Sequence, residues 1–238
     1  MKEYFKNLYI GSNENFYKII KKNVKNNKKT FVITANAETF MFAKKDKTMN
    51  EIILNKNNLV VADGISILMG AKKLKLEVPT KITGVEMMEN LLINSKHNKV
   101  YLLGSKKEVL TKLVDKINSI YPNVSLVGYH DGYNYDETKV INEILKTKPD
   151  FIFIALGIPK QEKLINKIID KVNKGVFIGV GGSFDVISGV KKRAPKIIRK
   201  LNLEWLYRII KEPKRIKRFY QNNIKFLIKI KGEKEWKD

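Results

Sequence analysis

Six short runs of apolar and β-branched residues recur along the chain, and they constrain its fold more than any other feature of the sequence. Short runs with almost no polar residue are typical of strands covered on both faces, and the longer segments of helical period between them predict parallel βαβ units. The sequence therefore predicts an α/β fold, a Rossmann-like layered domain with a mainly parallel sheet. The runs are residues 30–35, 59–62, 100–104, 124–128, 151–156 and 176–181.

Residues 105–122 illustrate the segments between the predicted strands. Their apolar residues recur at helical spacing up to Pro122, which predicts a helix that ends near this proline. Ser105 stands three residues before Glu108, a spacing that resembles a capping box. We therefore expect Ser105 to cap this helix.

Polar residues and glycines follow each of the six runs. Ligands bind outside the carboxyl ends of the strands in an open parallel sheet, so these residues are candidates for a functional site. The alternative is that they are ordinary turn and cap residues, because the loops after strands collect Gly, Asp and Ser. The residues are Thr34, Asn36, Asp63, Gly64, Gly104, Ser105, 130–133, 157–161, 181–183 and Asp185.

For Asp63 and Gln161, the local sequence pattern allows both a functional role and an ordinary structural role. An Asp at a strand end can cap the following helix, or it can act as a general base if it lies in a shielded cleft beside a hydroxyl. Gln161 follows Pro159 in the first turn of a predicted helix, where an amide suits hydrogen bonding to a sugar or a base. The alternative is a polar surface residue. Both questions stay open on pattern alone.

Several site classes lack their signature in this chain. Residues 179–185 read GVGGSFD, which is not GxGxxG, and the chain contains no Walker A motif. It has no cysteine, which excludes disulfides and thiolate chemistry. Its two histidines, His97 and His130, have no HxxxH or DxD partner sequence, so we expect no metal site. We expect His97 at the surface, and His130 is a weaker candidate for the strand-end site.

The formal net charge of +23 implies an anionic partner, and its distribution narrows the choice. Residues 191–238 hold 17 Lys and Arg against 5 Asp and Glu, whereas residues 1–190 hold 30 against 19. We therefore predict a core domain over residues 1–190 and a basic helical appendage over residues 191–238. No apolar run is long enough to span a bilayer, and the first residues do not resemble a signal peptide, so we expect a cytoplasmic protein.

The residues of the appendage have the pattern of an amphipathic helix. Pro213 suits the first position of a helix, and an apolar stripe follows it. Such a helix can lie in a membrane interface, bind nucleic acid, or pack its stripe on the core with its charges in solvent. The stripe consists of Ile216, Phe219, Tyr220, Ile224, Leu227 and Ile228.

Several segments, in order and across nearly the whole chain, resemble the WecG/TagA/CpsF glycosyltransferases. They are TANAETF, VVADGISI, LLGSKKEV, ALGIPKQE, GVGGSFDVISG, KKRAP and LEWLYRIIKEPKRIKRFY. The resemblance implies metal-independent transfer of a sugar, with inversion, from a UDP-sugar to a sugar linked to a polyprenyl diphosphate. One branch of the family adds N-acetylmannosamine to undecaprenyl-diphosphate-linked N-acetylglucosamine at the start of wall teichoic acid synthesis, and other branches use N-acetylmannosaminuronic acid or other hexoses. It implies no cofactor.

The resemblance also implies where such an enzyme works and what it contacts. It implies a peripheral protein on the inner face of the cell membrane, whose basic appendage binds the anionic surface and completes the active site. Self-association of the core is compatible with it. The rival hypotheses from the residues are a basic nucleic-acid-binding module and a nucleotide-binding regulatory domain without catalysis.

The family motifs can be placed on this sequence residue by residue. They imply that Asp63 is the base that takes the proton from the acceptor hydroxyl. They imply substrate contacts for Thr34, Asn36 and Gln161, and diphosphate contacts for Arg208, Arg215 and Arg218. Weaker matches for the nucleotide-sugar pocket are Gly104, Gly132, Tyr133 and Asp185. Lys81 stands where the family usually has Arg, which keeps the positive charge but not the bidentate geometry.

Overall fold

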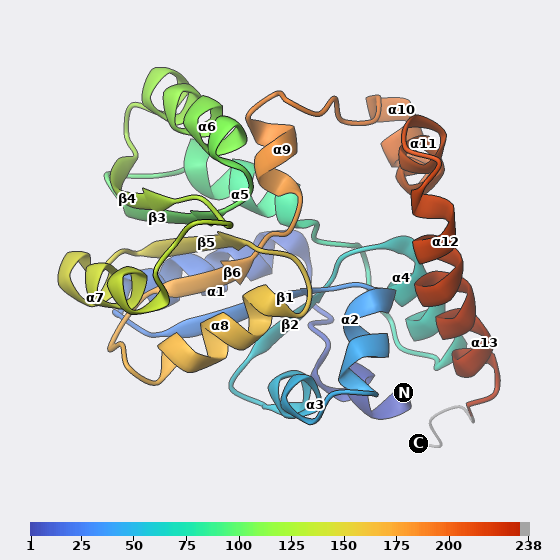
Figure 1. Ribbon diagram of the computed structural model, residues 1–238. Coiled ribbons are helices and arrows are strands. Elements are labelled where there is room, and N and C mark those ends of the chain that lie inside the picture. The colour runs from blue at the N-terminus through green and yellow to red at the C-terminus, as the bar shows by residue number, and fades with distance from the viewer. Residues whose placement is uncertain (234–238) are drawn as a thin grey trace.

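The computed structural model of the protein describes residues 1–233, and within them it contains one six-stranded, entirely parallel sheet in the order β2-β1-β6-β5-β3-β4. Helices cover both faces of the sheet (Figure 1). The predicted α/β class and the predicted strands are confirmed. The strands are β1 (Thr30–Ala35), β2 (Leu59–Ala62), β3 (Lys99–Gly104), β4 (Ser125–His130), β5 (Phe151–Ala155) and β6 (Val176–Gly179).

The helices of the core alternate with these strands. They are the 3-10 helix η1 (Lys2–Asn7), α1 (Asn13–Lys25), α2 (Ala37–Ala43), α3 (Lys47–Leu54), α4 (Ile65–Lys73), α5 (Gly84–Ile93), α6 (Lys107–Ile120), α7 (Glu137–Thr147), α8 (Lys160–Ile169) and α9 (Ser183–Ile187). The remaining helices belong to the predicted appendage: α10 (Lys196–Lys200), α11 (Glu204–Lys211), α12 (Arg215–Phe219), the π-helix η2 (Tyr220–Ile224) and α13 (Lys225–Lys231).

Two apolar clusters, one on each face of the sheet, form the core. Successive residues of β1 alternate between them, since Phe31 and Ile33 belong to one cluster and Val32 to the other. Helices α2, α3, α4, α7 and α8 supply the first cluster, and α1, α5, α6 and α9 supply the second. This double cover explains why the strands are almost continuously apolar.

The C-terminal helices form a column along one side of the domain (Figure 1). Its last helix, α13, packs on α2 and α4. There Phe226 lies within the aromatic cluster of Phe5, Phe40 and Phe226, with ring centroids 6.3 Å from Phe5 and 6.2 Å from Phe40. The apolar cluster of the core thus extends into α13, although we placed the boundary of the core at residue 190. The last five residues of the predicted appendage lie outside the described residues.

Two local expectations are wrong. Ser105 does not cap α6, because Lys106 precedes the helix and Ser105 has a left-handed φ of 60°. Its hydroxyl donates instead to Asp185, at 3.4 Å. Pro213 is not the first residue of a helix either, since it lies in the turn between α11 and α12.

Among residues 1–233, none of the helices combines the length and the apolar character needed to cross a membrane.

Candidate active site

Asp63 lies directly after β2, at the carboxyl edge of the sheet. Its backbone N–H donates to the carbonyl of Ala35 at the end of β1, 2.7 Å away. Its side chain does not cap α4, the following helix, whose N-cap is Gly64 with a φ of 129°. Instead Oδ2 accepts a hydrogen bond from the backbone N–H of Gly84, the first residue of α5, at 3.2 Å. The carboxylate therefore sits between two helix starts, held at one oxygen.

The surroundings of Asp63 make it more basic than an ordinary aspartate. Burial is the largest effect, and it raises the pKa of Asp63 to about 6. The hydrogen bond from Gly84 and the positive charge of Arg208 lower this pKa, whereas the negative charges of Glu204 and Glu86 raise it. Arg208 and Glu204 belong to α11, so the appendage lies within electrostatic reach of Asp63. A carboxylate that titrates near pH 6 can accept a proton at neutral pH.

Asn36 and Thr34 lie at the end of the neighbouring strand, β1. Asn36 is the N-cap of α2 and forms a capping box with Thr39, with 3.1 Å between the Thr39 N–H and the Asn36 Oδ1. It is also next to Gly64, where an added Cβ would lie 3.8 Å from the Asn36 Cβ. Thr34 is buried, and its hydroxyl donates to the carbonyl of Gly179 on β6 at 2.7 Å. Asn36 therefore borders Asp63, whereas Thr34 ties two strands together beneath the edge.

Gln161 is buried at the start of α8 and uses its amide within the protein. Its Oε1 accepts from the backbone N–H groups of Gly157, at 3.2 Å, and Gly181, at 3.1 Å. Its Nε2 donates to Glu162 at 2.8 Å. We expected this amide to face a ligand, but in the structure it joins the loops that follow β5 and β6.

A cavity of about 470 Å³ opens at the ends of β3 and β5. Helices α6 and α8, which follow these two strands, go to opposite faces of the sheet, and a parallel sheet binds ligands where its connections diverge in this way. Tyr133 is 72% exposed at its rim. The lining residues are Ser105, Gly132, Tyr133, Tyr135, Glu137, Ala155, Leu156 and Lys160.

Close backbone approach explains two of the glycines predicted for this pocket. Gly104 has a φ of 130°, and an added Cβ would lie 2.5 Å from the backbone of Ala155. A Cβ on Gly132 would lie 3.0 Å from the Cα of Gly104 and 2.9 Å from a methyl group of Leu156. Both glycines therefore shape the cavity through their backbone.

Asp185 and Lys81 lie near the two ends of this edge. Asp185, in the first turn of α9, accepts from Ser105 and lies 3.6 Å from the Lys191 Nζ. Lys81 precedes Ile82, whose N–H donates to the carbonyl of Ala62 at 2.8 Å. Lys81 thus belongs to the loop beside the end of β2, next to Asp63.

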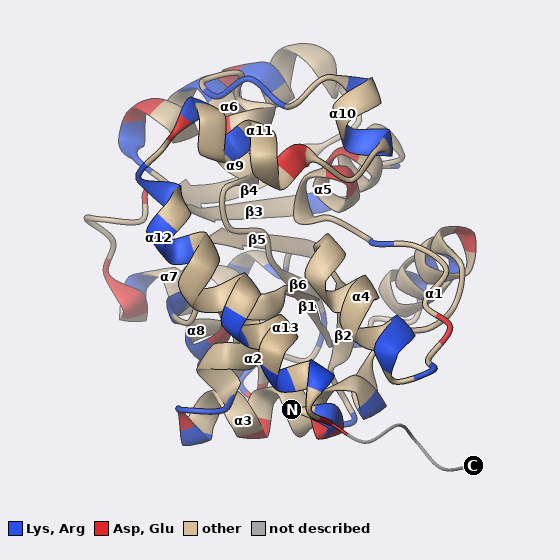
Figure 2. Cartoon of the chain, turned by 90° about the vertical axis from the view of Figure 1, so that its right-hand side faces the viewer, with Lys and Arg blue, Asp and Glu red and all other residues tan. Residues whose placement is uncertain are grey.

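The three arginines predicted for diphosphate binding all have carboxylate partners. Arg208 pairs with Glu204 within α11, and the Arg215 Nε lies 2.6 Å from Glu212. Arg218 makes a two-pronged contact with Glu38 in the first turn of α2, with a shortest distance of 2.8 Å. Figure 2 views the molecule from this side and shows Lys and Arg distributed along α10–α13. Arg218 therefore links the appendage to the edge beside Asn36.

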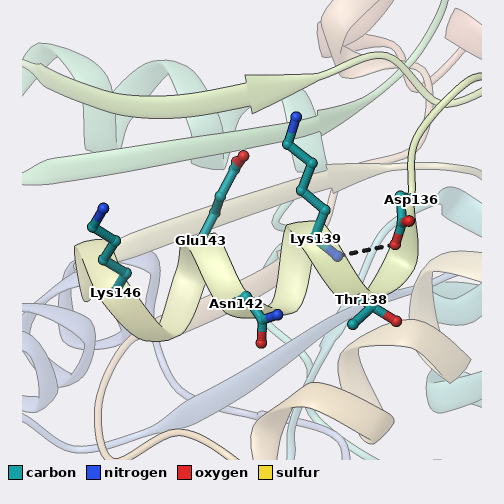
Figure 3. A pocket seen from close by; sticks show the side chains of 6 residues that line it. All are labelled: Asp136, Thr138, Lys139, Asn142, Glu143 and Lys146. Carbon is teal, nitrogen blue, oxygen red and sulfur yellow. Dashed lines mark hydrogen bonds between the residues drawn. The ribbon is translucent and has the colours of Figure 1, made fainter.

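A second hollow, of about 450 Å³, lies on α7 (Figure 3). Glu143 accepts there from the Tyr101 hydroxyl at 2.9 Å and lies 2.8 Å from the His130 Nε2. His130 is thereby engaged with α7, and among the described residues no three His, Cys, Asp or Glu side chains are grouped so as to hold a metal ion. The lining residues are Asp136, Thr138, Lys139, Asn142, Glu143 and Lys146.

Glu162 was missed by the sequence reasoning. It is only 2% exposed, and burial raises its pKa to about 7, with a further contribution from the negative charge of Glu38. The sequence does contain a signal for the burial of the preceding residue, Gln161. Gln161 stands three, four and seven residues before Leu164, Ile165 and Ile168, which form the buried face of α8, and this helical spacing indicates a buried amide. Glu162 stands three residues before Ile165 and seven before Ile169, which is a weaker form of the same spacing.

The doubly covered parallel sheet, with its polar residues gathered at the carboxyl edge, places the protein in the Rossmann-like α/β class. The model of the WecG/TagA/CpsF glycosyl transferase family matches residues 7–237, so the chain belongs to that family and is a glycosyltransferase.

Two relatives share one name, N-acetylglucosaminyldiphosphoundecaprenol N-acetyl-beta-D-mannosaminyltransferase. The one from Bacillus subtilis (strain 168) is 39% identical over 233 residues, which cover 96% of this chain and 91% of the relative. The one from Staphylococcus aureus (strain MW2) is 38% identical over 202 residues, which cover 84% of this chain and 79% of the relative.

Proposed function

We propose that the protein transfers N-acetylmannosamine from UDP-N-acetylmannosamine to undecaprenyl-diphosphate-linked N-acetylglucosamine, in the synthesis of the wall teichoic acid linkage unit. The names of the two relatives support the transferred sugar and the acceptor. The observation that carries the chemistry is Asp63, a partly buried carboxylate with a raised pKa, between two helix starts and within electrostatic reach of Arg208.

In this proposal the reaction is a single displacement. The acceptor hydroxyl oxygen attacks the anomeric carbon while its proton passes to Asp63, and the bond from that carbon to the UDP oxygen breaks. Attack from the face opposite the leaving group inverts the anomeric centre. A pKa of about 6 leaves Asp63 mostly ionised at neutral pH, and its partial burial strengthens its interaction with the hydroxyl proton.

The leaving UDP carries negative charge that must be stabilised. In the proposal its nucleotide occupies the 470 Å³ cavity, where Lys160 is the cationic lining residue and the Tyr133 ring offers a face for the base. Arg208, Arg215, Arg218 and Lys81 compensate the diphosphates of donor and acceptor, each arginine exchanging its carboxylate partner for phosphate oxygens. Guanidinium groups bind both kinds of anion through the same fork.

The acceptor is a lipid, so we propose that the protein works at the inner face of the cell membrane. Exposed apolar residues on α11 and α12, such as Ile210 at 67% and Ile216 at 61%, stand among Lys and Arg residues, the composition of a helix that lies in an anionic interface. Self-association of the core stays a prediction.

Donor choice tests the proposal. The purified protein is incubated with a lipid-diphosphate N-acetylglucosamine acceptor and, in turn, UDP-N-acetylmannosamine, its uronic acid and UDP-glucose, with and without EDTA. We expect product only with the first donor, in the β configuration by NMR, and the same rate with EDTA. Product from only one of the other donors contradicts the donor assignment. Salt-sensitive nucleic-acid binding without any sugar transfer would favour the nucleic-acid-binding alternative.

A further inference from the structure

Glu162, the third residue of α8, has an acidic side chain that is almost fully buried. Acidic residues are rarely so buried unless a cation or several hydrogen-bond donors surround them. Among the described residues one side-chain donor reaches it, since its Oε1 accepts from the Gln161 Nε2 at 2.8 Å, and its own backbone N–H also favours the ionised form. Its other oxygen, Oε2, is buried and has no hydrogen-bond partner among the described residues. A carboxyl whose second oxygen is unpaired contributes little stability, and its hydrogen bond with the Gln161 side chain points to another role.

That contact fixes which way the Gln161 amide faces. Oε1 of Glu162 is the acceptor in this pair, and any proton on the carboxyl can sit on the unpaired Oε2, so the NH₂ end of Gln161 points toward Glu162 and its carbonyl end away from it. The carbonyl end then faces two backbone donors, the N–H groups of Gly157 and Gly181. In the opposite orientation, the NH₂ group would face these two N–H groups. No hydrogen bond could then form, because all three groups are donors.

The oriented amide holds together the middle of the carboxyl edge. Gly157 belongs to the loop after β5, beside Leu156 of the cavity, and Gly181 belongs to the loop after β6. The Gln161 side chain also lies against Gly179, where an added Cβ would be 2.6 Å from Nε2. The carbonyl of Gly179 in turn accepts from Thr34 at the end of β1. One amide therefore joins the cavity side of the edge to the strand that borders Asp63.

We propose that Glu162 is a positioning residue: its buried carboxyl orients the Gln161 amide, which holds the loops after β5 and β6 at fixed places between the nucleotide cavity and Asp63. Glu162 does not touch the substrate. It acts through Gln161, and the assignment of its catalytic effect rests on the proposed glycosyl transfer.

The test compares two substitutions that differ in whether they keep the accepting oxygen. E162Q keeps the volume and a carbonyl oxygen that can accept from Gln161, whereas E162M has a similar volume and no such acceptor. We expect E162M to lower kcat by about 10-fold to 100-fold, with a smaller change in the KM for the donor. The reason is that a small displacement of the groups at the carboxyl edge of the sheet lowers the reaction rate strongly. E162Q should retain most of the turnover. The same Glu-to-Met change at Glu51, exposed on α3, serves as the matched control and should leave kcat unchanged.

A double-mutant cycle with Gln161 separates positioning from a general structural role. If Glu162 acts through the amide, Q161M should lower kcat, and adding E162M to it should change kcat little further. Independent, additive losses in the cycle overturn the proposal. So does wild-type turnover in E162M, or an equal loss in E162Q and E162M.

A second readout does not depend on catalysis. Glycine-selective ¹⁵N labelling follows hydrogen exchange at the Gly157 and Gly181 amides in the unliganded protein. We expect faster exchange at both amides in E162M and near-normal exchange in E162Q and E51M. Unchanged exchange in E162M refutes the positioning role of Glu162, even if the protein is an active transferase. Faster exchange in E162M, together with no sugar transfer by the wild type, refutes only the proposed function. If E162M does not fold, E162Q decides alone, since faster exchange there contradicts the proposal.

Discussion

The core and the basic appendage of this protein are held by different forces. The strands and the helices that cover them bury apolar side chains in two clusters, whereas α10, α11 and α12 bury none of their residues. Three connections between the basic residues and the core are ion pairs: Arg193 with Glu86 at 2.8 Å, Arg199 with Glu86 at 3.5 Å, and Arg218 with Glu38 at 2.8 Å. Of the appendage helices that the structure describes, α13 alone buries apolar side chains, those of Phe226 and Ile230.

This difference suits an appendage that exchanges its anionic partners and a core that holds its strand-end groups in place. Ion pairs at a surface contribute about 0 to 1 kcal/mol each and weaken with salt, so α10–α12 can exchange carboxylate partners for other anions at little cost. The core must instead keep its strand-end groups in place, and apolar packing does so at any ionic strength. Substitutions at the rigid site in the core should therefore have larger effects than substitutions at the weakest contact of the appendage.

The largest effect is expected from Asp63→Asn, which keeps the shape of the side chain and removes the proposed base. We expect kcat to fall about 10²-fold to 10⁴-fold, the usual contribution of a general base, with donor binding retained. UDP release under saturating substrates measures kcat. Asp115→Asn, an exposed residue of α6, is the control. Near-normal turnover in the Asp63 variant would remove this residue as the base.

The same substitution should stabilise the fold at neutral pH. The native pKa of Asp63, about 6, exceeds its ordinary value of 3.8, so the native state binds the proton more tightly than the unfolded chain. The free energy of unfolding of the wild type therefore falls as the pH rises from about 4 to about 6. Asp63→Asn escapes this loss, and we expect a gain on the order of 1 to 3 kcal/mol at pH 7.5 that disappears below pH 4. Thermal denaturation at both pH values measures it, and an equal gain at pH 3.5 contradicts the explanation.

The next effect concerns the membrane. Replacing Ile210 and Ile216 together by Asp should weaken binding to anionic vesicles by roughly tenfold or more for each residue, because each loses the burial of an apolar side chain in the interface. Turnover of a soluble acceptor analogue should persist. Ile93→Asp is the control, since Ile93 is exposed to 66% on α5, in the core. Vesicle sedimentation reports binding, and equal losses in the control and the double variant would refute a specific membrane face.

Arg208→Met should change the pH profile as well as the rate. The positive charge of Arg208 lowers the pKa of Asp63, so its loss raises that pKa and moves the acid limb of kcat to higher pH, by up to about one unit. Loss of a diphosphate partner should also lower kcat by on the order of tenfold. Lys211→Met, on the same helix, should leave the acid limb in place. An unshifted limb in the Arg208 variant would show that the appendage does not influence the base.

The smallest effect is expected from Glu38→Gln, which breaks the contact with Arg218. Arg218 is exposed to 62%, so the free energy of unfolding should fall by less than about 1 kcal/mol. The difference from wild type should shrink at 1 M salt, where screening weakens the ion pair. Chemical denaturation at low and high salt measures it, with Glu14→Gln, from the exposed pair with Lys18, as the control. A loss that is large and independent of salt would mean that the appendage is held by packing here.

The sequence predicted the sheet well because burial on both faces leaves a strong local signal. The six runs fall at the strands, and the polar residues that follow them meet at one edge, as the rule for parallel sheets implies. The local sequence pattern did not predict the hydrogen-bond partner of a side chain when that partner lies far away in the sequence. Ser105 follows a cap-like spacing but turns to Asp185, 80 residues further on, and Gln161 is drawn to backbone groups of two loops.

The appendage was hardest to predict in detail. Its apolar stripe follows helical spacing, yet Ile216, Tyr220 and Ile228 are exposed. Leu227 of the stripe packs against the core, but the fully buried residues of α13 are Phe226 and Ile230, which lie outside the stripe. A π-helical turn at Tyr220–Ile224 shifts the helical phase between α12 and α13, so a single period drawn through both cannot find the buried face.

The aromatic cluster of Phe5, Phe40 and Phe226 has a consequence for how the chain is made. Gly70 on α4 leaves room for it, since an added Cβ would lie 2.7 Å from the Phe5 ring and 3.3 Å from the Phe226 ring. During vectorial synthesis on the ribosome, Phe5 and Phe40 emerge long before Phe226, and domains fold while the chain grows. The apolar surface that Phe226 covers therefore stays exposed until Phe226 itself has left the ribosome. A nascent chain from which Phe226 has not yet emerged is expected to recruit chaperones, and one from which it has emerged is expected to release them.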